Sequence, residues 1–101
     1  MSLNWLSHFW GQVQLDLLCK DRKGHFVVIE IKRLRASTES IIDQITRYIG
    51  WVQERLATPG KLVRGIIIVG RPDHKLTYSV RAIPNVSIKS FTLSLQDYIA
   101  R

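Results

Sequence analysis

Two carboxylates interrupt apolar stretches of the sequence, and their positions suit chemistry at a metal ion. Asp16 lies within the largely apolar residues 13–20, and Glu30 lies within residues 25–33. Aspartate and, less strongly, glutamate are depleted in β-strands, so a carboxylate well inside a strand needs a specific reason. Side chains alternate along a strand, so Lys32 is expected on the same face as Glu30. We therefore predict an active site made of Asp16, Glu30 and Lys32.

The two stretches that hold these carboxylates predict a β-hairpin. Both are rich in Val, Ile, Leu or Phe, and residues 22–24 between them form a turn that ends in glycine. A three-residue loop with a left-handed glycine pairs Asp16 with Glu30 on one face of the sheet. Directly opposed Cβ atoms lie about 4.5 to 5.5 Å apart, which lets two carboxylates bind one divalent cation. The same register predicts pairs closer to the turn: Asp21 with His25, Lys20 with Phe26, and Leu18 with Val28.

The types of these side chains indicate which metal and which reaction to expect. Oxygen ligands, with no histidine or thiolate predicted beside them, suit Mg²⁺ or Mn²⁺. His8, His25 and His74 are scattered and show no metal-ligand spacing. Lys32 can stabilise charge developing on a phosphate or orient an attacking water, and a bound metal lowers the pKa of that water. Together these groups predict the hydrolysis of phosphodiester bonds.

An excess of positive charge makes nucleic acid the expected partner. The 101 residues include 15 Lys and Arg against 8 Asp and Glu, a formal net charge of +7. Such an excess attracts polyanions, although charge that only maintains solubility would give the same composition. Arg33 and Arg35, just beyond the glutamate, and Arg47 are candidate phosphate contacts. A solvated surface position is nearly as good an interpretation for each arginine.

The remaining segments predict the elements that would position this site. Residues 37–57 carry apolar side chains at a spacing of three and four, which indicates a long amphipathic helix. Residues 62–69 follow as a strand. Because they are apolar without alternation, we expect other elements to cover both faces of this strand. That strand should run parallel to the one that holds Ile29. The core-facing residues of the helix are expected to be Ile41, Ile45, Tyr48, Val52 and Leu56, with Ile42 and Ile49 alongside.

The two ends of the chain predict shorter elements. Residues 3–10 are rich in aromatics and favour a short helix packed on a core. Residues 74–83 indicate a second helix, which Pro84 and Asn85 close, and residues 86–93 return as a strand. The overall expectation is a layered α/β domain: a mixed β-sheet that begins with an antiparallel hairpin, is crossed by the long helix, and continues with a parallel strand.

Length and composition limit the class of protein. A chain of 101 residues with 46% hydrophobic content suits one domain, which we expect to be part of a longer protein. The longest apolar stretches are far shorter than the roughly 20 residues of a membrane span, and no signal peptide is evident, so we expect a cytoplasmic protein. Cys19 has no partner for a disulfide and is expected to be a small buried residue. The aromatic N-terminus and a sheet edge suggest a homodimer.

The spacing of Asp16 and Glu30-Ile31-Lys32 resembles the signature of the PD-(D/E)XK nuclease superfamily. That signature is an aspartate followed at a distance by Asp or Glu, any residue, and Lys. More narrowly, residues 16–21, 24–33 and 44–51 resemble the catalytic domain of NucS-like endonucleases. The resemblance spans residues 11–93, which is most of the chain.

This resemblance implies a restriction-endonuclease-like core and a role for each matching residue. Asp16, Glu30 and the backbone carbonyl of Ile31 would bind a divalent metal, and Lys32 would be the catalytic lysine. Gln44 and Tyr48 match the helical Gln-x-x-x-Tyr motif of the family. These two residues lie one turn apart on one helix face, so both could contact the substrate. Tyr48 also fits the core-facing stripe of the helix.

Three functions remain to be compared. The first is a metal-dependent DNA endonuclease that acts in DNA repair or processing. The second is a non-catalytic nucleic-acid-binding module with the same fold, and the third is a structural partner domain in a larger repair complex. The presence of Asp16, Glu30 and Lys32 favours the endonuclease. The sequence leaves open the structure of the DNA substrate and whether RNA is cleaved.

Overall fold

A mixed five-stranded sheet covered by two helices forms the body of the protein. The computed structural model describes residues 2–4, 9–10, 13–14, 17–32, 36–92 and 94–97. In chain order the elements are β1 (Ser2–Asn4), β2 (Phe9–Trp10), β3 (Val13–Gln14), β4 (Leu17–Lys20), β5 (Phe26–Ile31), α1 (Thr38–Arg55), β6 (Val63–Val69), α2 (His74–Arg81) and β7 (Val86–Ser90). No helix within the described ranges is both long enough and apolar enough to cross a membrane.

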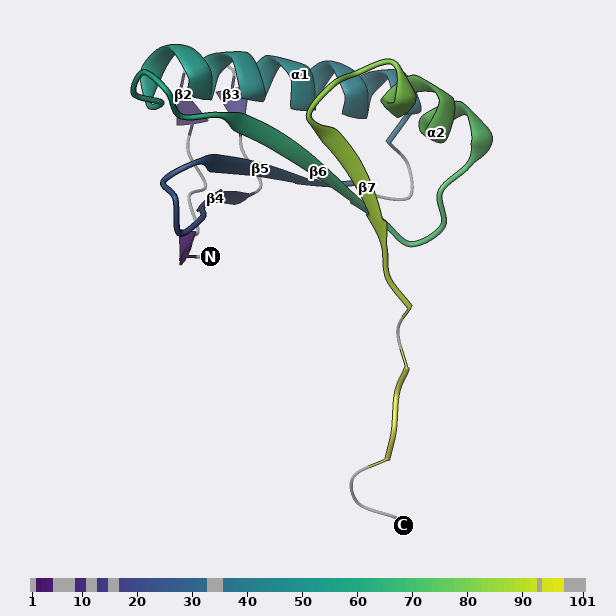
Figure 1. The fold of residues 1–101 in the computed structure, drawn as a ribbon. Helices are drawn as coiled ribbons and strands as arrows, with labels where there is room; N and C mark the ends of the chain where they lie inside the picture. The colour runs from purple at the N-terminus through teal and green to yellow at the C-terminus, as the bar shows by residue number, and fades with distance from the viewer. Residues whose placement is uncertain are drawn as a thin grey trace.

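The strands are arranged in the order β1-β4-β5-β6-β7, with β5 in the middle. The pairs β1–β4 and β4–β5 are antiparallel, whereas β5–β6 and β6–β7 are parallel. Strands β2 and β3 form a separate antiparallel pair. The prediction of a mixed sheet that begins with a hairpin and continues with a parallel strand is therefore confirmed (Figure 1).

The hairpin between β4 and β5 has the predicted turn and register. Gly24 has a φ of 84°, a left-handed conformation that favours glycine, and its N–H donates to the Asp21 carbonyl at 3.0 Å. The Asp21 N–H donates to the His25 carbonyl at 2.9 Å. Of the predicted pairs, Leu18–Val28 and Lys20–Phe26 are both observed. Each side chain of the hairpin therefore has the facing that the loop length predicts.

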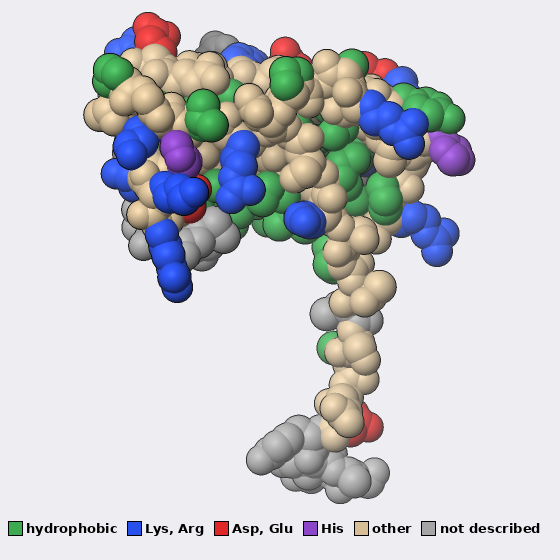
Figure 2. Space-filling model, in the orientation of Figure 1, with side chains coloured by type: hydrophobic (Ala, Val, Ile, Leu, Met, Phe, Trp, Pro, Cys, Tyr) green, Lys and Arg blue, Asp and Glu red, His purple; other side chains and the backbone are tan. Residues whose placement is uncertain are grey.

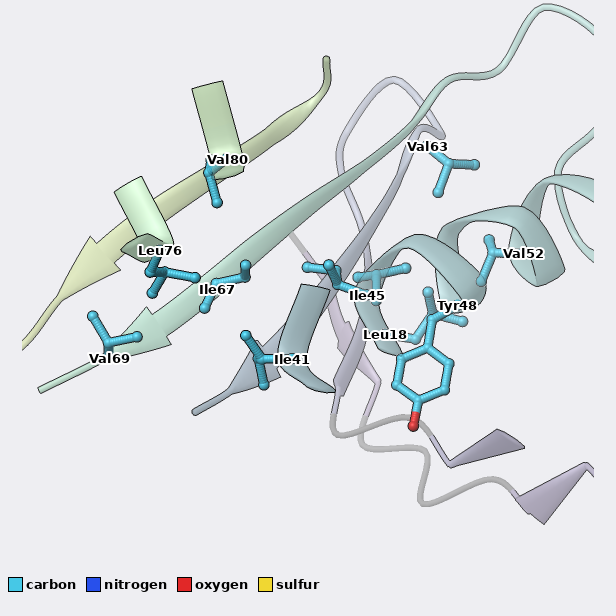
Figure 3. Close-up of a cluster of buried hydrophobic side chains, with 11 residues drawn as sticks. Leu18, Ile41, Ile45, Tyr48, Val52, Val63, Ile67, Val69, Leu76 and Val80 are labelled. Atoms are coloured by element: carbon cyan, nitrogen blue, oxygen red, sulfur yellow. The ribbon is translucent and has the colours of Figure 1, made fainter. Parts of the chain in front are cut away.

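The main core lies between the sheet and the two helices. Side chains from β4, β5, β6, α1 and α2 form one cluster, so both helices cover the same face of the sheet. Its buried members are Leu18, Val28, Ile41, Ile45, Tyr48, Val52, Val63, Ile67, Val69, Leu76 and Val80, most of which are drawn in Figure 3. Cys19, Val27 and Ile29 form a second cluster on the opposite face, where Ile66 and Ile68 are only partly buried.

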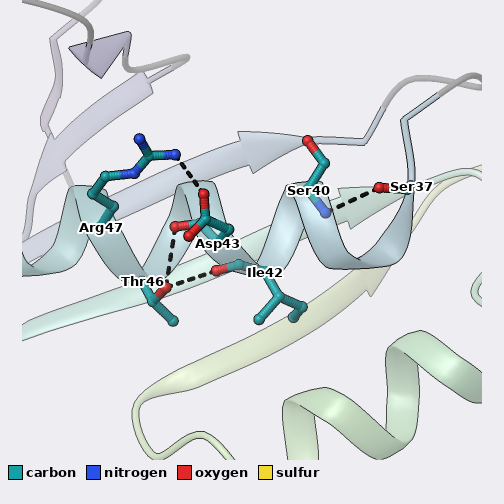
Figure 4. Close-up of polar contacts among 6 residues, drawn as sticks. All are labelled: Ser37, Ser40, Ile42, Asp43, Thr46 and Arg47. Atoms are coloured by element: carbon teal, nitrogen blue, oxygen red, sulfur yellow. Dashed lines mark hydrogen bonds and ion pairs between the residues drawn. The ribbon is translucent and has the colours of Figure 1, made fainter.

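Both helices begin at a capping side chain. The Ser37 hydroxyl accepts a hydrogen bond from the Ser40 N–H at 3.0 Å, which satisfies one free donor of the first turn of α1 (Figure 4). Asp73 caps α2 in the same way through the Leu76 N–H at 2.8 Å. The core-facing stripe of α1 is confirmed for four of its five residues. Leu56, at the end of the helix, is 40% exposed instead.

Three predictions about the ends of the chain are wrong. Of residues 3–10, those that the structure describes lie in the strands β1 and β2 and not in the expected helix, and β1 pairs with the edge of β4. The expected strand over residues 13–20 is divided: β3 pairs with β2, whereas β4 pairs with β1 and β5. The last strand ends at Ser90, and residues 94–97 form no regular structure. Long-range strand pairing, which local patterns do not encode, decides these cases.

The close contact between β6 and α1 leads to a prediction about stability. A β-carbon at Gly65 would lie 2.8 Å from Ile45 Cδ1 and 3.0 Å from Ile49 Cδ1. Ile45 is fully buried and has little room to move, so we expect Gly65→Ala to lower the free energy of unfolding by about 1 to 3 kcal/mol. Urea denaturation followed by circular dichroism would measure this change.

Gly50→Ala is the matched control for Gly65→Ala. Gly50 lies on the exposed side of α1, and a β-carbon there would meet no atom within 4 Å. Alanine has the higher helix propensity, so this variant should gain about 0.5 to 1 kcal/mol. Equal stability of the Gly65→Ala variant and the wild type would contradict the packing of α1 on β6.

Candidate active site

Glu30 is a buried carboxylate within the helix-covered face of the sheet. It follows Val28 on that face and is paired with Ile67 of β6, and both of these neighbours are fully buried. Glu30 itself is only 4% exposed, and among the described residues no other charged side chain is buried. Burying an ionised carboxylate is costly unless positive charge or hydrogen-bond donors compensate it. A carboxylate is a group that can bind a cation, and the role of Glu30 as a metal ligand stays a prediction.

Lys32 continues β5 on the same side as Glu30. Its N–H donates to the Ile68 carbonyl at 2.9 Å, so the pairing of β5 with β6 extends one residue beyond the strand. With this backbone, alternation directs the Lys32 side chain to the side of Glu30, about 6.5 Å further along. Lys32 is half-buried. The predicted arrangement of Glu30 and Lys32 on one face is thus supported by the observed pairing.

Helix α1 begins near this end of the sheet. Thr38, the first residue of α1, is the sixth residue after Lys32, so the helix must start within roughly 20 Å of Lys32. Further along α1, Ile45 and Ile49 lie over Gly65, in the amino-terminal half of β6. The helix therefore runs from the carboxyl end of β5 towards its amino end. Its first turn, the positive end of the helix dipole, faces the end of the sheet that holds Glu30.

Gln44 and Tyr48 of α1 differ in their surroundings. Tyr48 is 5% exposed and belongs to the same core cluster as Leu18 of β4, beside which it appears in Figure 3. Gln44, one turn earlier, is half-buried. The core-facing interpretation of Tyr48 is confirmed. A contact of either side chain with substrate stays a prediction.

The structure does not bring every predicted residue to this site. Three of them lie outside the described residues: Asp16, Arg33 and Arg35. The described hairpin pair next to Asp16 in the sequence is Leu17–Ile29. Arg47 is exposed on α1 and forms an ion pair with Asp43 one turn earlier (Figure 4). Its helical position directs it away from the buried stripe, so it is not brought together with Glu30 and Lys32. Its contact with phosphate stays a prediction.

The burial of Thr38 was not predicted from the sequence. Thr38 is 7% exposed, although it is the first residue of α1. Ser37 takes the capping role, which leaves the Thr38 side chain directed to the core side of the helix. A hydroxyl is therefore buried at the end of α1 that lies nearest to the carboxyl end of β5.

The donors near Glu30 fit the type of metal that the sequence predicts. Cys19 lies on the opposite face of the sheet, where burial raises the pKa of its thiol. His25 lies at the other end of β5, where its Nδ1 accepts the Leu62 N–H at 2.9 Å. Within the described ranges no three His, Cys, Asp or Glu side chains gather closely enough to hold a metal. The Glu30 carboxylate and the Ile31 carbonyl are oxygen donors of the kind that Mg²⁺ and Mn²⁺ prefer.

Solved structures of a repair endonuclease and of EndoMS share this fold. A repair endonuclease from Pyrococcus abyssi matches 88% of this chain and 37% of its own, with a TM-score of 0.70 and 20% sequence identity. The EndoMS–dsDNA2 complex matches 94% of this chain and 38% of its own, with a TM-score of 0.72 and 20% identity. EndoMS in apo form matches 78% of this chain and 32% of its own, with a TM-score of 0.61 and 23% identity.

These similarities assign the class of domain. The chain has a mixed α/β fold similar to part of each of these structures, and it spans less than two-fifths of the length of the chains it matches. Residues 10–80 match the family described as the Endonuclease NucS C-terminal domain, and the chain belongs to that family. The prediction of a NucS-like domain is confirmed at this level.

The burial of Glu30 leads to a prediction about metal binding. A ligand that binds only the folded protein raises its stability by mass action, so saturating Mn²⁺ or Mg²⁺ should raise the melting temperature of the wild type. Glu30→Gln keeps the shape of the side chain but removes its charge, and this variant should lose most of that rise. Thermal denaturation with increasing metal concentration would measure the difference without any need for activity.

Glu54→Gln serves as the matched control for Glu30→Gln. Glu54 is exposed in the last turn of α1, at the opposite end of the helix from Thr38, and its replacement removes the same charge. The metal-dependent rise should therefore be retained in Glu54→Gln. An equal rise in the wild type and Glu30→Gln would exclude Glu30 as a ligand.

Proposed function

We propose that this chain is the catalytic domain of a metal-dependent endonuclease of the PD-(D/E)XK type, which hydrolyses DNA phosphodiester bonds in DNA repair or processing. The observation that carries the proposal is the burial of Glu30 beside Lys32 at the carboxyl end of the central strand. Membership of the NucS C-terminal domain family supports it. The description of two matched structures as a repair endonuclease and as a complex with dsDNA supports DNA as the substrate.

In this proposal, Asp16, Glu30 and the carbonyl of Ile31 hold one Mg²⁺ or Mn²⁺ ion. The hairpin register supports this set, since Leu17 pairs with Ile29 and the next predicted pair is Asp16 with Glu30. When bound, such an ion supplies positive charge at the phosphate and lowers the pKa of water. Two carboxylates also balance the charge of the ion better than one, which favours the pair over Glu30 alone.

The protein's own groups would act on the phosphate that is cut. Hydrolysis adds a water oxygen to phosphorus, breaks one P–O bond of the backbone and leaves a proton on the departing oxygen. The Lys32 ammonium would stabilise the negative charge that develops on the phosphate oxygens. Because Lys32 is half-buried, this interaction is screened less than it would be at an exposed position. The amide of Gln44 would orient the substrate from α1.

The experiment that tests this proposal is a cleavage assay on labelled DNA. Single-stranded, branched and mismatched double-stranded substrates would be incubated with Mg²⁺ or Mn²⁺, and with chelator as the control. We expect metal-dependent cleavage by the wild type. Asp16→Ala and Lys32→Ala should each reduce the rate by a factor on the order of 10² to 10³ or more, because each removes charge stabilisation at the reacting phosphate.

Glu54→Gln should cleave at the wild-type rate, since this exposed carboxylate lies in the last turn of α1, at the opposite end of the helix from Thr38. Cleavage that persists in Asp16→Ala and Lys32→Ala would exclude the proposed site. DNA binding without cleavage by the wild type would instead favour the non-catalytic binding module. A chain that neither binds nor cuts DNA would favour the structural partner domain.

A further inference from the structure

A cluster of basic side chains surrounds the turn of the β4–β5 hairpin, at the opposite end of β5 from Glu30. We call it the turn cluster, and Figure 2 shows Lys and Arg side chains gathered over this part of the surface. Its five members come from the hairpin and from the start of β6, and all are exposed: Lys20, Arg22, Lys23, Lys61 and Arg64. Asp21 is the one acidic residue within residues 20–25 and 61–64.

Contacts between the two segments make the turn cluster a defined surface. Lys61 Nζ donates to the Lys23 carbonyl at 2.8 Å, although 38 residues separate them in the sequence. The Leu62 N–H donates to His25 Nδ1, which joins the same segments a second time. Within the turn, Asp21 Oδ1 accepts the N–H groups of Lys23 and His25, both at 2.9 Å. The turn that presents these charges is therefore held in one conformation.

The carboxylate of Asp21 binds the backbone of this turn and does not cancel the positive charge of the turn cluster. Desolvation raises the pKa of Asp21, but the backbone N–H groups of His25 and Lys23 outweigh it, and the pKa is lowered overall. The carboxylate therefore stays ionised at neutral pH while its oxygen is occupied by the backbone. The five basic side chains leave a large local excess of positive charge, which attracts the phosphates of a nucleic acid.

An open depression continues the surface from Arg64 to β7. Its volume is about 240 Å³, and it is lined by Arg64, Gly65, Asn85, Val86 and Ser87. A guanidinium, a side-chain amide and a hydroxyl are all groups that bind phosphate oxygens. The depression thus extends the phosphate-binding character of the turn cluster across the amino ends of the parallel strands.

The side chains at the turn cluster favour a duplex over a single strand. Proteins that bind single strands combine positive charge with exposed aromatic rings on which bases stack. Within residues 20–26 and 61–64 the ring-bearing side chains are His25 and Phe26, and both are only partly exposed. Lys20 Nζ lies 5.3 Å from the centre of the Phe26 ring, which further limits stacking. Contacts to the phosphate backbone alone suit double-stranded DNA.

The length of β5 sets the distance between the turn cluster and Glu30. Glu30 is the fourth residue after Phe26, and the tip of the turn lies beyond Phe26, so the separation is roughly 20 Å at about 3.3 Å per residue. A base pair occupies about 3.4 Å of a duplex, so this distance corresponds to about six base pairs. From this geometry we propose that the turn cluster binds the backbone of duplex DNA about six base pairs from the bond cut at Glu30. The position of the cut rests on the function proposed above.

The first test is duplex binding by a variant that lacks two charges of the turn cluster. The double variant Arg22→Gln, Lys23→Gln should bind a fluorescent duplex several-fold more weakly than the wild type at moderate salt. The slope of log affinity against log salt should fall by about 2, because roughly 0.9 counterion is released per phosphate contact. Fluorescence anisotropy over a salt series would measure both values.

The double variant Arg81→Gln, Lys89→Gln is the matched control. Both residues are exposed on α2 and β7, away from the turn, and the variant loses the same net charge. It should keep a steeper salt slope than the Arg22, Lys23 variant. Equal effects of the two double variants would overturn the proposal, since a nonspecific loss of charge would then explain both. A loss confined to single-stranded DNA or to duplex RNA would overturn duplex DNA as the partner.

A second test uses cleavage and the length of the duplex flank. With a long flank on either side of the cut, the Arg22, Lys23 variant should show a raised KM and an almost unchanged kcat. Duplexes with fewer than about six base pairs on the flank that reaches the turn should remove the difference in KM between this variant and the wild type. An unchanged difference on short flanks would overturn the predicted spacing. Absence of cleavage by any variant would refute the nuclease function, while the binding comparison would still decide whether the turn cluster contacts DNA.

Discussion

The register of the β4–β5 hairpin is the constraint on which the arrangement of the candidate site depends. Gly24 adopts a left-handed conformation, and Asp21 holds the turn through backbone N–H groups, so the loop has three residues and no other register is favoured. A shift by one residue would turn every side chain of one strand to the other face. A shifted register would also remove the pairing of Leu17 with Ile29, the described hairpin pair next to Glu30. The geometry of the turn thus controls a site at the far end of β5.

Glu30 is a carboxylate buried on a face of the sheet whose other buried residues are apolar. The same face holds Val28 and Ile67, which are fully buried, and α1 covers it with Ile41 and Ile45. An apolar residue at position 30 would suit such a face better, because a buried carboxylate carries a desolvation cost. The same burial reduces screening and strengthens the attraction between a carboxylate and a cation. A residue that is unfavourable for packing is thus the one best suited to bind a metal ion.

The parallel part of the sheet separates two kinds of surface. Glu30 and Lys32 lie at the carboxyl end of β5, close to the first turn of α1, whereas the turn cluster and the depression beside Arg64 lie at the amino ends of β5, β6 and β7. A strand has a nearly fixed rise per residue, so the distance between the two surfaces is built into the length of β5. Two surfaces at a constant spacing suit a stiff, regularly charged partner such as duplex DNA.

The sequence alone determined the features that depend on local periodicity and turn chemistry. Alternation in the hairpin and the spacing of three and four in α1 predicted the mixed fold, the facing of Glu30 and the core position of Tyr48. The tertiary structure alone decided what depends on distant segments: the pairing of β1 with β4 and the contact of Lys61 with the turn. Such contacts form between residues far apart in the chain, so no local pattern encodes them.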